Sequence, residues 1–577
     1  MAENKLTWMI GGKAGYGIMV TGMIFSKSCV RGGLHVFDSV EYPSLIRGGH
    51  NTYHVRVEED EIHSHIELID ILVALNKETV DKHKDKVTER GAIIYDSSET
   101  EINEGDVRKD IRMYDIPLLE IAKEHGNELM MNTVALGATM AIVDYDLGIL
   151  EGVIKDEFSD KGKDVVNSNI ESARDGYNNA RANYNNNFRS KLSPSSDKGM
   201  ILLTGNDAIA MGAIRAGCRF YSAYPMTPAS SILHYMAAHE LSKGVVVKQT
   251  EDEISAIHTA IGASFAGARA MTATSGGGFC LMSEGLGLAA LTETPLVIAL
   301  CQRAGPSTGL ATRTEQADLR FAMHASQGEF PRVIMAPGDV EEAFTLTAKA
   351  FNLAEKYQIP VIVMSDKHLS ESHKSSEKNR FNIDYEIDRG FLVPEWNDGE
   401  FRRFMITDNG VSPRALPGQE GTVFRTSSYE RDEYGWNSES PENRTAMNDK
   451  RIRKTESIIS EIPDPSVYGP EDADITLIAW GSTKGAVLEA MKFLEKESIN
   501  ANFIHITHIL PFKAESVRKM LESAKKTLIV EQNHDLQLGG IIMQYTGVCI
   551  DRSLANYTGR QVLPHEIYDK AKEVLAR

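Results

Sequence analysis

A stiff loop at residues 224–230 holds the first side chain that could take part in chemistry. Its sequence, YPMTPAS, places Thr227 between two prolines. Each proline fixes its own φ and pushes the preceding residue toward an extended conformation, so the Thr227 hydroxyl has little freedom. Such a hydroxyl could face a substrate. An ordinary helix-start turn is the simpler interpretation of the spacing alone.

Glu253 is the acidic residue that we single out for proton transfer. It follows Glu251 and Asp252 and begins a helix predicted over residues 254–268, whose faces are rich in Ala, Ser and Gly. A carboxyl group at the start of a buried helix is a candidate for a perturbed pKa. Acidic residues also stabilise the helix dipole at this position, so the residues alone leave both interpretations open.

Other polar loops follow predicted strands. Two such loops lie in the same predicted domain as the loop at 224–230, and each directly follows a strand: residues 275–278 (SGGG) and 302–313 (QRAGPSTGLATR). Ligands bind at the carboxyl ends of strands in parallel sheets. Near the N-terminus, a glycine turn at 11–17 (GGKAGYG) precedes a helix, and a polar loop at 41–51 (EYPSLIRGGHN) lies between strands. The glycines of the turn lack the spacing of the dinucleotide-binding motif, so close backbone packing explains their presence as well as a bound anion does.

Bulk properties exclude several classes of function. The net charge of -19 argues against nucleic acid as the main partner. The sequence contains no run of 18 apolar residues, which a membrane-spanning helix would need, and the polar N-terminus does not resemble a signal peptide. We therefore expect a cytoplasmic location. The five cysteines form no Cys-x-x-Cys pair, and no His-Glu-x-x-His spacing occurs. We therefore expect no metal site built from this chain alone.

The order of elements predicts three open, mostly parallel α/β domains, because strands alternate with helices along most of the chain. A length of 577 residues is too great for one core. The expected division is a first domain at 1–190, a linker at 191–198, a second domain at 199–372, an irregular arm or linker at 373–470, and a third domain at 471–577.

These motifs resemble the 2-oxoacid:ferredoxin oxidoreductase family, and specifically alpha subunits with a gamma domain fused at the N-terminus. The 2-oxoglutarate members are the most similar. The resemblance covers residues 5–570 and rests on the motifs at 11–17, 41–51, 224–230, 251–253, 274–278 (TSGGG), 302–319 (QRAGPSTGLATRTEQADL) and 412–418 (SPRALPG). Met226 and Ala229 depart mildly from the family pattern. Arg431 stands where a histidine is frequent, which puts the local role of that histidine in doubt.

The resemblance implies a fold and a set of partners. The first domain would be the gamma domain, the second would resemble the pyrimidine-binding domain of thiamine diphosphate enzymes, and the third would be transketolase C-terminal-like. A partner beta subunit would hold the diphosphate half of the cofactor, Mg²⁺ and a 4Fe-4S cluster, in an assembly of two alpha and two beta chains. Ferredoxin, coenzyme A (CoA) and 2-oxoglutarate would be the other partners.

The resemblance also implies roles for single residues. Glu253 would hydrogen-bond the pyrimidine ring, where burial would raise its pKa and favour sharing a proton. Tyr224, Pro225 and Ser275 would contact the cofactor. The catalytic set would be completed by two substrate ligands, Thr227 and Arg313.

Arg313 would hold the substrate carboxylate and is preferred to Arg303, because the family's Ala/Pro-Thr-Arg element matches residues 311–313. In the fused domain, Ser44 and Arg47 would reach the far end of the substrate. An arginine there suits the second carboxylate of 2-oxoglutarate, although a surface turn with a solvated arginine is the simpler interpretation of that loop.

Other functions are compatible with the same resemblance. A pyruvate or broad-specificity 2-oxoacid enzyme shares much of the loop at 41–51. A non-catalytic scaffold or binding subunit is the alternative from a different class, and the presence of Thr227, Glu253 and Arg313 argues against it.

Overall fold

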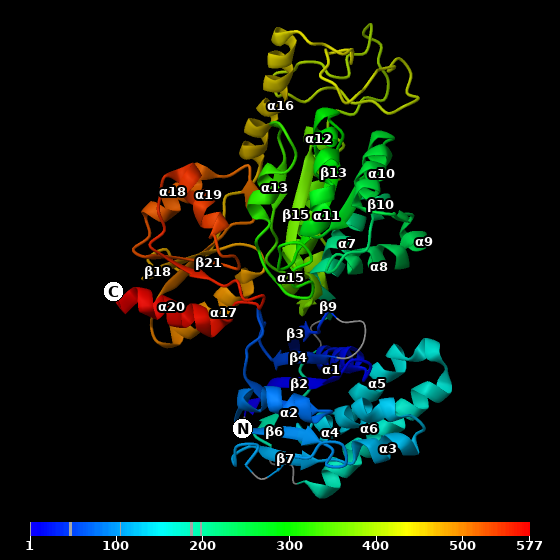
Figure 1. The fold of residues 1–577 in the computed structure, drawn as a ribbon, viewed down its shortest axis with the longest axis vertical. Coiled ribbons are helices and arrows are strands. Elements are labelled where there is room, and N and C mark those ends of the chain that lie inside the picture. Colours follow the sequence, from blue (N-terminus) through cyan, green and yellow to red (C-terminus); the bar gives the residue numbers. More distant parts are fainter. Residues whose placement is uncertain (1, 45–48, 104, 185–187, 197–198, 577) are drawn as a thin grey trace. The chain divides into compact units, whose positions relative to one another are not determined.

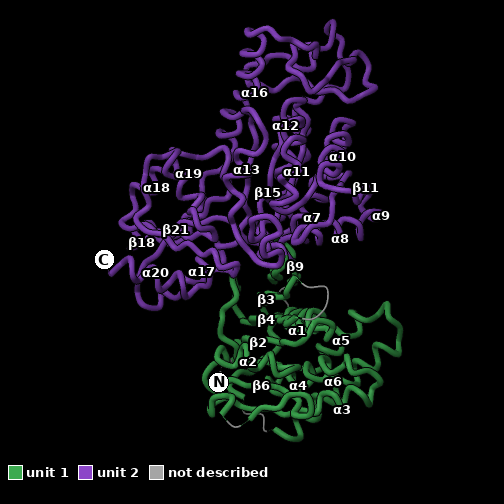
Figure 2. Tube along the Cα trace, in the orientation of Figure 1, with its two compact units in different colours: residues 1–203, 371–380 green, residues 204–370, 381–577 purple. Residues whose placement is uncertain are grey.

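The computed structural model describes residues 2–44, 49–103, 105–184, 188–196 and 199–576. It divides into two compact units, which are described separately (Figures 1 and 2). The first comprises Met1–Leu203 with Glu371–Arg380, and the second comprises Thr204–Ser370 with Phe381–Arg577.

The first unit contains an eight-stranded mixed sheet. In spatial order its strands are β7 (Arg112–Asp115), β6 (Val87–Tyr95), β5 (Ile69–Ala74), β2 (Lys5–Lys13), β4 (His50–Glu58), β3 (His35–Glu41), β16 (His373–Glu377) and β9 (Met200–Thr204). β2, β5, β6 and β7 are parallel, whereas β4 runs antiparallel to both of its neighbours. The helices are α1 (Ile18–Arg31), α2 (Lys77–His83), α3 (Leu118–Glu124), α4 (Met131–Ile142), α5 (Leu147–Glu157) and α6 (Lys163–Asn183). A short strand, β1 (Ala2–Glu3), pairs with β8 (Ser190–Lys191).

The boundaries of the first unit differ from the domain boundaries expected at residues 199 and 372, because of two strands. β9 and β16 were expected in the second domain and the arm, but both belong to the sheet of the first unit. β16 is fixed there by side chains as well as by its pairing with β3: His373 Nδ1 lies 2.9 Å from Asp38 Oδ1, and Val36 N–H donates to Ser375 Oγ at 2.8 Å.

The second unit contains a seven-stranded sheet that positions the candidate site. Its order is β11 (Val246–Gln249), β10 (Phe220–Ala223), β12 (Ala270–Thr274), β13 (Leu296–Gln302), β15 (Pro360–Asp366), β14 (Val333–Met335) and β20 (His508–Leu510). All are parallel except β20, which pairs antiparallel with β14. The helices are α7 (Gly205–Arg215), α8 (Ser230–Ala238), α9 (Glu240–Lys243), α10 (Glu253–Phe265), α11 (Gly276–Leu281), α12 (Ser283–Leu291), α13 (Leu319–His324), α14 (Val340–Tyr357) and α15 (Lys367–Glu371).

A five-stranded sheet completes the second unit. Its order is β17 (Ser466–Tyr468), β19 (Ala501–His505), β18 (Ile475–Ala479), β21 (Thr527–Glu531) and β22 (Arg552–Ala555), with only β17 antiparallel among the described strands. Its helices are α17 (Thr483–Lys496), α18 (Ala514–Glu522), α19 (Gln537–Thr546) and α20 (Pro564–Ala576). We call residues 466–576 the third domain. β20 and a shared apolar core join it to the seven-stranded sheet.

The segment expected to be irregular, residues 373–470, is ordered by buried charge. Besides β16, it contains the long helix α16 (Pro441–Glu461). Lys450 and Lys454, one helical turn apart, both form ion pairs with the buried carboxylate of Glu293. Lys450 Nζ lies 2.6 Å from Oε1, and Lys454 Nζ lies 2.6 Å from Oε2. Because a buried unpaired charge is strongly unfavourable, these pairs fix α16 on the sheet domain.

A second buried carboxylate holds the rest of the arm. Glu355 on α14 pairs with Arg269 of the sheet domain and with Arg389 and Arg414 of the arm, each at 2.7 Å. The arm therefore meets the core of the second unit at two buried glutamates.

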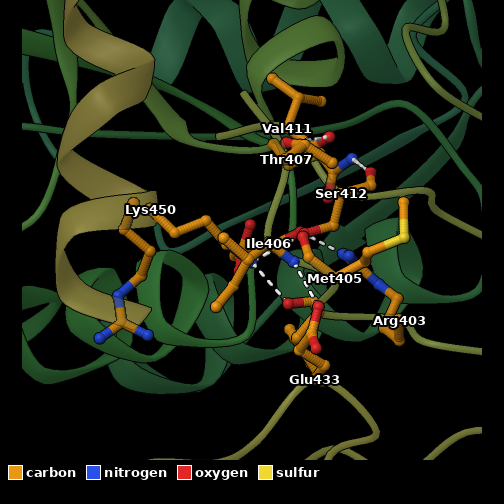
Figure 3. A network of polar contacts seen from close by, with 12 residues as sticks. Arg403, Met405, Ile406, Thr407, Val411, Ser412, Glu433 and Lys450 are labelled. Carbon is orange, nitrogen blue, oxygen red and sulfur yellow. Dashed lines mark hydrogen bonds and ion pairs between the residues drawn. The ribbon is translucent and has the colours of Figure 1, made fainter. Parts of the chain in front are cut away.

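Figure 3 shows how the arm is joined internally near α16. Ser412 accepts a hydrogen bond from Lys450 at 2.7 Å and donates to Met405 O at 2.9 Å. Ile406 N–H donates to Glu433 Oε1 at 2.8 Å. The bonds at Met405 O and Ile406 N–H satisfy backbone groups of a segment that forms few regular elements of its own.

Within the described residues, no helix combines the length and apolar character needed to cross a membrane.

Candidate active site

The candidate residues of the second unit lie in loops and a helix start at one edge of the seven-stranded sheet. The loops after β10, β12 and β13 and the start of α10 all follow parallel neighbouring strands, so they emerge at the same carboxyl edge (Figure 1). This is the edge at which parallel α/β sheets bind ligands.

Glu253 is the first residue of α10 and is only 2 % exposed. Asp252 caps the helix by accepting from Ser255 N–H at 2.8 Å, which fixes the direction in which the helix leaves the strand. The Oε1 atom of Glu253 is buried and has no hydrogen-bond partner within the described residues. Burial raises the pKa of this carboxyl group above its ordinary value, and the charge of Asp252 adds to the rise.

Gly278, in helix α11, allows the carboxyl group of Glu253 to lie where it does. A Cβ atom at Gly278 would be 2.4 Å from Glu253 Oε1 and 2.0 Å from Thr274 Oγ1. Only glycine leaves room for both side chains at this position. Ser275, at the N-cap of α11, is fully buried, and its Oγ has no hydrogen-bond partner in the described part of the chain.

The loop at 224–230 places Thr227 half-buried and Tyr224 and Pro225 exposed. The Thr227–Pro228 peptide bond is cis. The backbone carbonyl of Thr227 accepts a hydrogen bond from Arg303 Nη1 at 2.8 Å. The structure therefore brings the loop after β10 to the loop after β13.

The two candidate arginines have different surroundings. Arg303 bonds to Thr227, and desolvation lowers its pKa while the charge of Asp318 opposes that shift. Arg313 lies in the same loop, and its Cβ is 3.2 Å from where a Cβ at Gly559 of the third domain would lie. Arg303, the less favoured candidate from sequence, thus has a described hydrogen bond to the Thr227 loop.

Asp318 is a site residue that sequence reasoning did not single out, although it lies within the motif at 302–319. Its Oδ2 is buried without a hydrogen-bond partner among the described residues, and a Cβ at Gly276 would lie 2.4 Å from it. Burial, together with the charge of Glu315, raises the pKa of Asp318 to about 6. The available signal was its position one residue before α13, which sequence alone cannot distinguish from an ordinary helix start.

The candidates in the first unit are less completely placed. Ser44 is exposed, and Arg47 lies outside the described residues. The glycine turn at 11–17 ends in Gly17, whose φ of 70° suits glycine, and Tyr16 O accepts from Asn132 Nδ2 at 3.0 Å. The turn is therefore held by packing against α4.

The residues at the carboxyl edge fit one half of a cofactor site. Oxygen atoms of Glu253 and Ser275 are buried and lack protein partners in the described structure, which is the state expected of groups that bond to a ligand. Metal binding has no such support, since the described residues contain no cluster of three or more His, Cys, Asp or Glu side chains suited to an ion.

Three family models match the chain in succession. Residues 7–179 match the pyruvate ferredoxin/flavodoxin oxidoreductase domain, and residues 211–450 match the thiamine diphosphate-binding domain of pyruvate flavodoxin/ferredoxin oxidoreductase. Residues 467–571 match the transketolase C-terminal domain. The matched domains thus define an oxidoreductase with a thiamine diphosphate-binding domain.

Relatives that match long stretches of the chain narrow the class of oxidoreductase. The chain is 34 % identical over 633 residues to the 2-oxoacid:ferredoxin oxidoreductase subunit alpha of Saccharolobus solfataricus, covering 99 % of this chain and 98 % of that protein. It is 36 % identical over 372 residues to the 2-oxoglutarate synthase subunit KorA of Methanothermobacter marburgensis, covering 64 % of this chain and 97 % of the relative.

A solved structure is similar over nearly the whole chain. It is the 2-oxoglutarate:ferredoxin oxidoreductase from Magnetococcus marinus with 2-oxoglutarate, coenzyme A and succinyl-CoA bound, with a TM-score of 0.92, 33 % identity, and coverage of 99 % of this chain and 100 % of that one. The chain belongs to the 2-oxoacid:ferredoxin oxidoreductase family, as an alpha subunit with a fused gamma-like domain. The fold class predicted from sequence is confirmed.

Adjacent glycines test the packing around Glu253. Gly278→Ala should displace the Glu253 carboxyl group, destabilise the protein by about 1–3 kcal/mol through overpacking, and weaken thiamine diphosphate binding. Gly277→Ala is the matched control for stability, since a Cβ at 277 would have no described atom within 4 Å. Thermal unfolding of both variants, with cofactor titration of Gly278→Ala in the presence of the partner subunit, checks this. Wild-type stability and affinity in Gly278→Ala would contradict it.

Proposed function

We propose that this chain is the alpha subunit of a 2-oxoglutarate:ferredoxin oxidoreductase. The enzyme would oxidatively decarboxylate 2-oxoglutarate with CoA to succinyl-CoA and CO₂ and reduce ferredoxin, or run the same reaction in reverse. The observation that supports the site is the buried Oε1 of Glu253, which lies against Gly278 without a described protein partner. A buried carboxyl oxygen in that position is explained by a ligand that bonds to it.

Glu253 is the residue proposed to hold and move a proton. Its raised pKa favours a carboxyl group that shares a proton with a ring nitrogen rather than one that stays fully ionised. Ser275 Oγ offers a second buried hydrogen-bonding group on the same side, and Tyr224 and Pro225 supply exposed surface for a ring. Bound there, thiamine diphosphate would supply the nucleophilic carbon and the electron sink that decarboxylation requires.

Thr227 and Arg313 are proposed to bind the 2-oxoacid. A guanidinium group binds a carboxylate through paired, charge-assisted hydrogen bonds, and a hydroxyl beside it can fix the keto group. Arg303 is the alternative carboxylate ligand, because it already bonds to the Thr227 backbone.

The proposed site requires a second chain. A beta subunit is proposed to hold the diphosphate, Mg²⁺ and a 4Fe-4S cluster, and to pass electrons to ferredoxin in a cytoplasmic assembly of two alpha and two beta chains. Two observations support a missing half. The buried oxygens Glu253 Oε1 and Ser275 Oγ have no described partner, and hydrophobic side chains that neighbour them in sequence are exposed, Ile254 at 47 % and Leu281 at 47 %.

The substrate proposal rests on relatives and on the loop at 41–51. The Magnetococcus marinus structure contains 2-oxoglutarate, and the KorA relatives are described as 2-oxoglutarate synthase subunits. Ser44 and Arg47 are the residues proposed to recognise the second carboxylate. Pyruvate or broad 2-oxoacid specificity is the alternative, because the Saccharolobus solfataricus relative, which matches 99 % of this chain, is described as a 2-oxoacid enzyme without a named substrate.

Methyl viologen reduction by the chain assembled with its partner subunit tests activity and substrate together. With CoA present, 2-oxoglutarate should be oxidised faster than pyruvate. Arg47→Ala should reduce that preference by on the order of tenfold, because a charged hydrogen bond contributes about 1.5–3 kcal/mol. Arg31→Ala, at an exposed ion pair of the same unit, should leave it unchanged. Faster turnover of pyruvate would reject the substrate, and no turnover of any 2-oxoacid would reject the function.

The two arginines of the loop after β13 can be separated by kinetics. Arg313→Met should raise KM for the 2-oxoacid by on the order of tenfold or more, since it removes the proposed carboxylate ligand. Arg303→Met, which loses the bond to Thr227 O, should have the smaller effect on KM. The opposite order would transfer the role to Arg303.

A further inference from the structure

Gln316 connects the loop after β13 to the third domain through all of its hydrogen-bonding groups. It is fully buried. Its backbone N–H donates to Gln532 O at 2.7 Å, and its Oε1 accepts from Gln532 N–H at 3.1 Å. Its Nε2 donates to Trp480 O at 2.9 Å, and its carbonyl accepts from Asn533 Nδ2 at 3.1 Å. The loop and the third domain are therefore joined by a buried polar contact in which each of these four groups of Gln316 has a partner, and such a contact fixes geometry more strictly than apolar packing does.

The place that Gln316 occupies is the position at which open α/β sheets usually bind ligands. In the sheet of the third domain, β18 lies between β19 and β21. The chain goes from β18 to its neighbour β19 on one side and then crosses to β21 on the other side of β18, so the direction of strand order reverses between β18 and β21. Ligands bind at the carboxyl ends of strands at such a reversal. Trp480 and Gln532 directly follow β18 and β21, and Gln316 lies between them.

The third domain is shaped to accept this side chain. A Cβ at Gly481 would lie 2.7 Å from Gln316 Nε2, and the φ of 59° at Gly481 also suits glycine. Asn533 is oriented by the buried carboxylate of Glu531, to which its Nδ2 donates at 2.9 Å. The side-chain amide of Asn533, which bonds to Gln316, is thus held in place by Glu531.

Neighbouring residues of the loop are attached in the same way. Gln537 Nε2 donates to Ala317 O at 2.7 Å, and its Oε1 accepts from Arg320 N–H at 2.8 Å. Thr314 N–H donates to Gly559 O at 3.3 Å. The segment from Thr314 to Arg320 therefore has repeated anchors on the third domain.

The geometry points to Gln316 as a positioning residue for the 2-oxoacid site. By filling the ligand crevice of the third domain, it fixes the loop that contains Arg303, Arg313 and Asp318 at the carboxyl edge of the seven-stranded sheet. The third domain thereby acts as a clamp on this loop and binds no small ligand at its own strand reversal. The inference rests on the proposed function, in which an arginine of the loop holds the substrate carboxylate.

Gln316→Met in the complex with the partner subunit tests the clamp. The substitution keeps the volume but removes the side-chain bonds to Trp480 and Gln532. KM for the 2-oxoacid should rise by on the order of tenfold or more, because small displacements of a positioning group weaken catalysis strongly, while thiamine diphosphate affinity stays within about twofold. Backbone amides of residues 303–319 should exchange hydrogen faster than in the wild type.

Gln561→Met is the matched control. Gln561 is also a buried glutamine of the third domain, 7 % exposed, but its side chain bonds to Ser482 within that domain. KM and exchange at 303–319 should stay at wild-type values in this variant. A Gln316→Met enzyme that matches the control in both KM and loop exchange would overturn the clamp.

The remaining outcomes also decide the inference. If the wild-type complex turns over no 2-oxoacid, the proposed function fails, and loop exchange alone then decides: faster exchange in Gln316→Met supports the clamp and unchanged exchange overturns it. If Gln316→Met does not assemble, Gln537→Ala, which removes the bonds to Ala317 and Arg320, must raise KM and loop exchange in the same direction. No change in that variant would overturn the inference.

Discussion

A buried carboxyl oxygen, Oε1 of Glu253, that has no hydrogen-bond partner among the described residues is the constraint on which the rest of this site depends. Leaving such an acceptor unpaired costs about 1–3 kcal/mol, so the fold must hold Glu253 in place against a preference for solvent. It does so through the cap of α10 and through Gly278 of α11, where any side chain would collide with the Glu253 carboxyl group. The unpaired oxygen supports the proposal that the site is half of a cofactor pocket, completed by a bound ring and a second chain.

Buried polar contacts, rather than apolar packing alone, set the geometry around that site. The arm is joined to the core at Glu293 and Glu355, each surrounded by basic side chains of distant sequence. The loop after β13 is joined to the third domain through Gln316. Replacing a buried ion pair by apolar residues often leaves stability unchanged or raises it, whereas removing one partner is costly. Contacts of this kind therefore specify which segments meet.

The sequence predicts the alternation of strands and helices, because most of the parallel strands are short apolar runs and most of the helices have a regular apolar period. It also predicts the loops that gather at the site, since these follow strands at their carboxyl ends. It does not predict β16, whose sequence HKSSE has no apolar pattern and pairs only because β3 offers an edge. It does not predict α16, whose buried face includes Lys450, Arg451 and Lys454, so a search for hydrophobic periodicity misses it. Asp318 and Gln316 are missed because their importance lies in contacts between segments far apart in the chain.

Proton exchange at the C2 carbon of bound thiamine diphosphate measures the role of Glu253 most directly. The rate can be followed by acid quench and NMR in the complex with the partner subunit, saturated with cofactor, for the wild type and for Glu253→Gln. The glutamine keeps the shape of the side chain but cannot exchange a proton in the same way, so exchange should slow by on the order of 100-fold or more while the cofactor stays bound. Equal exchange rates in the two proteins would contradict the account.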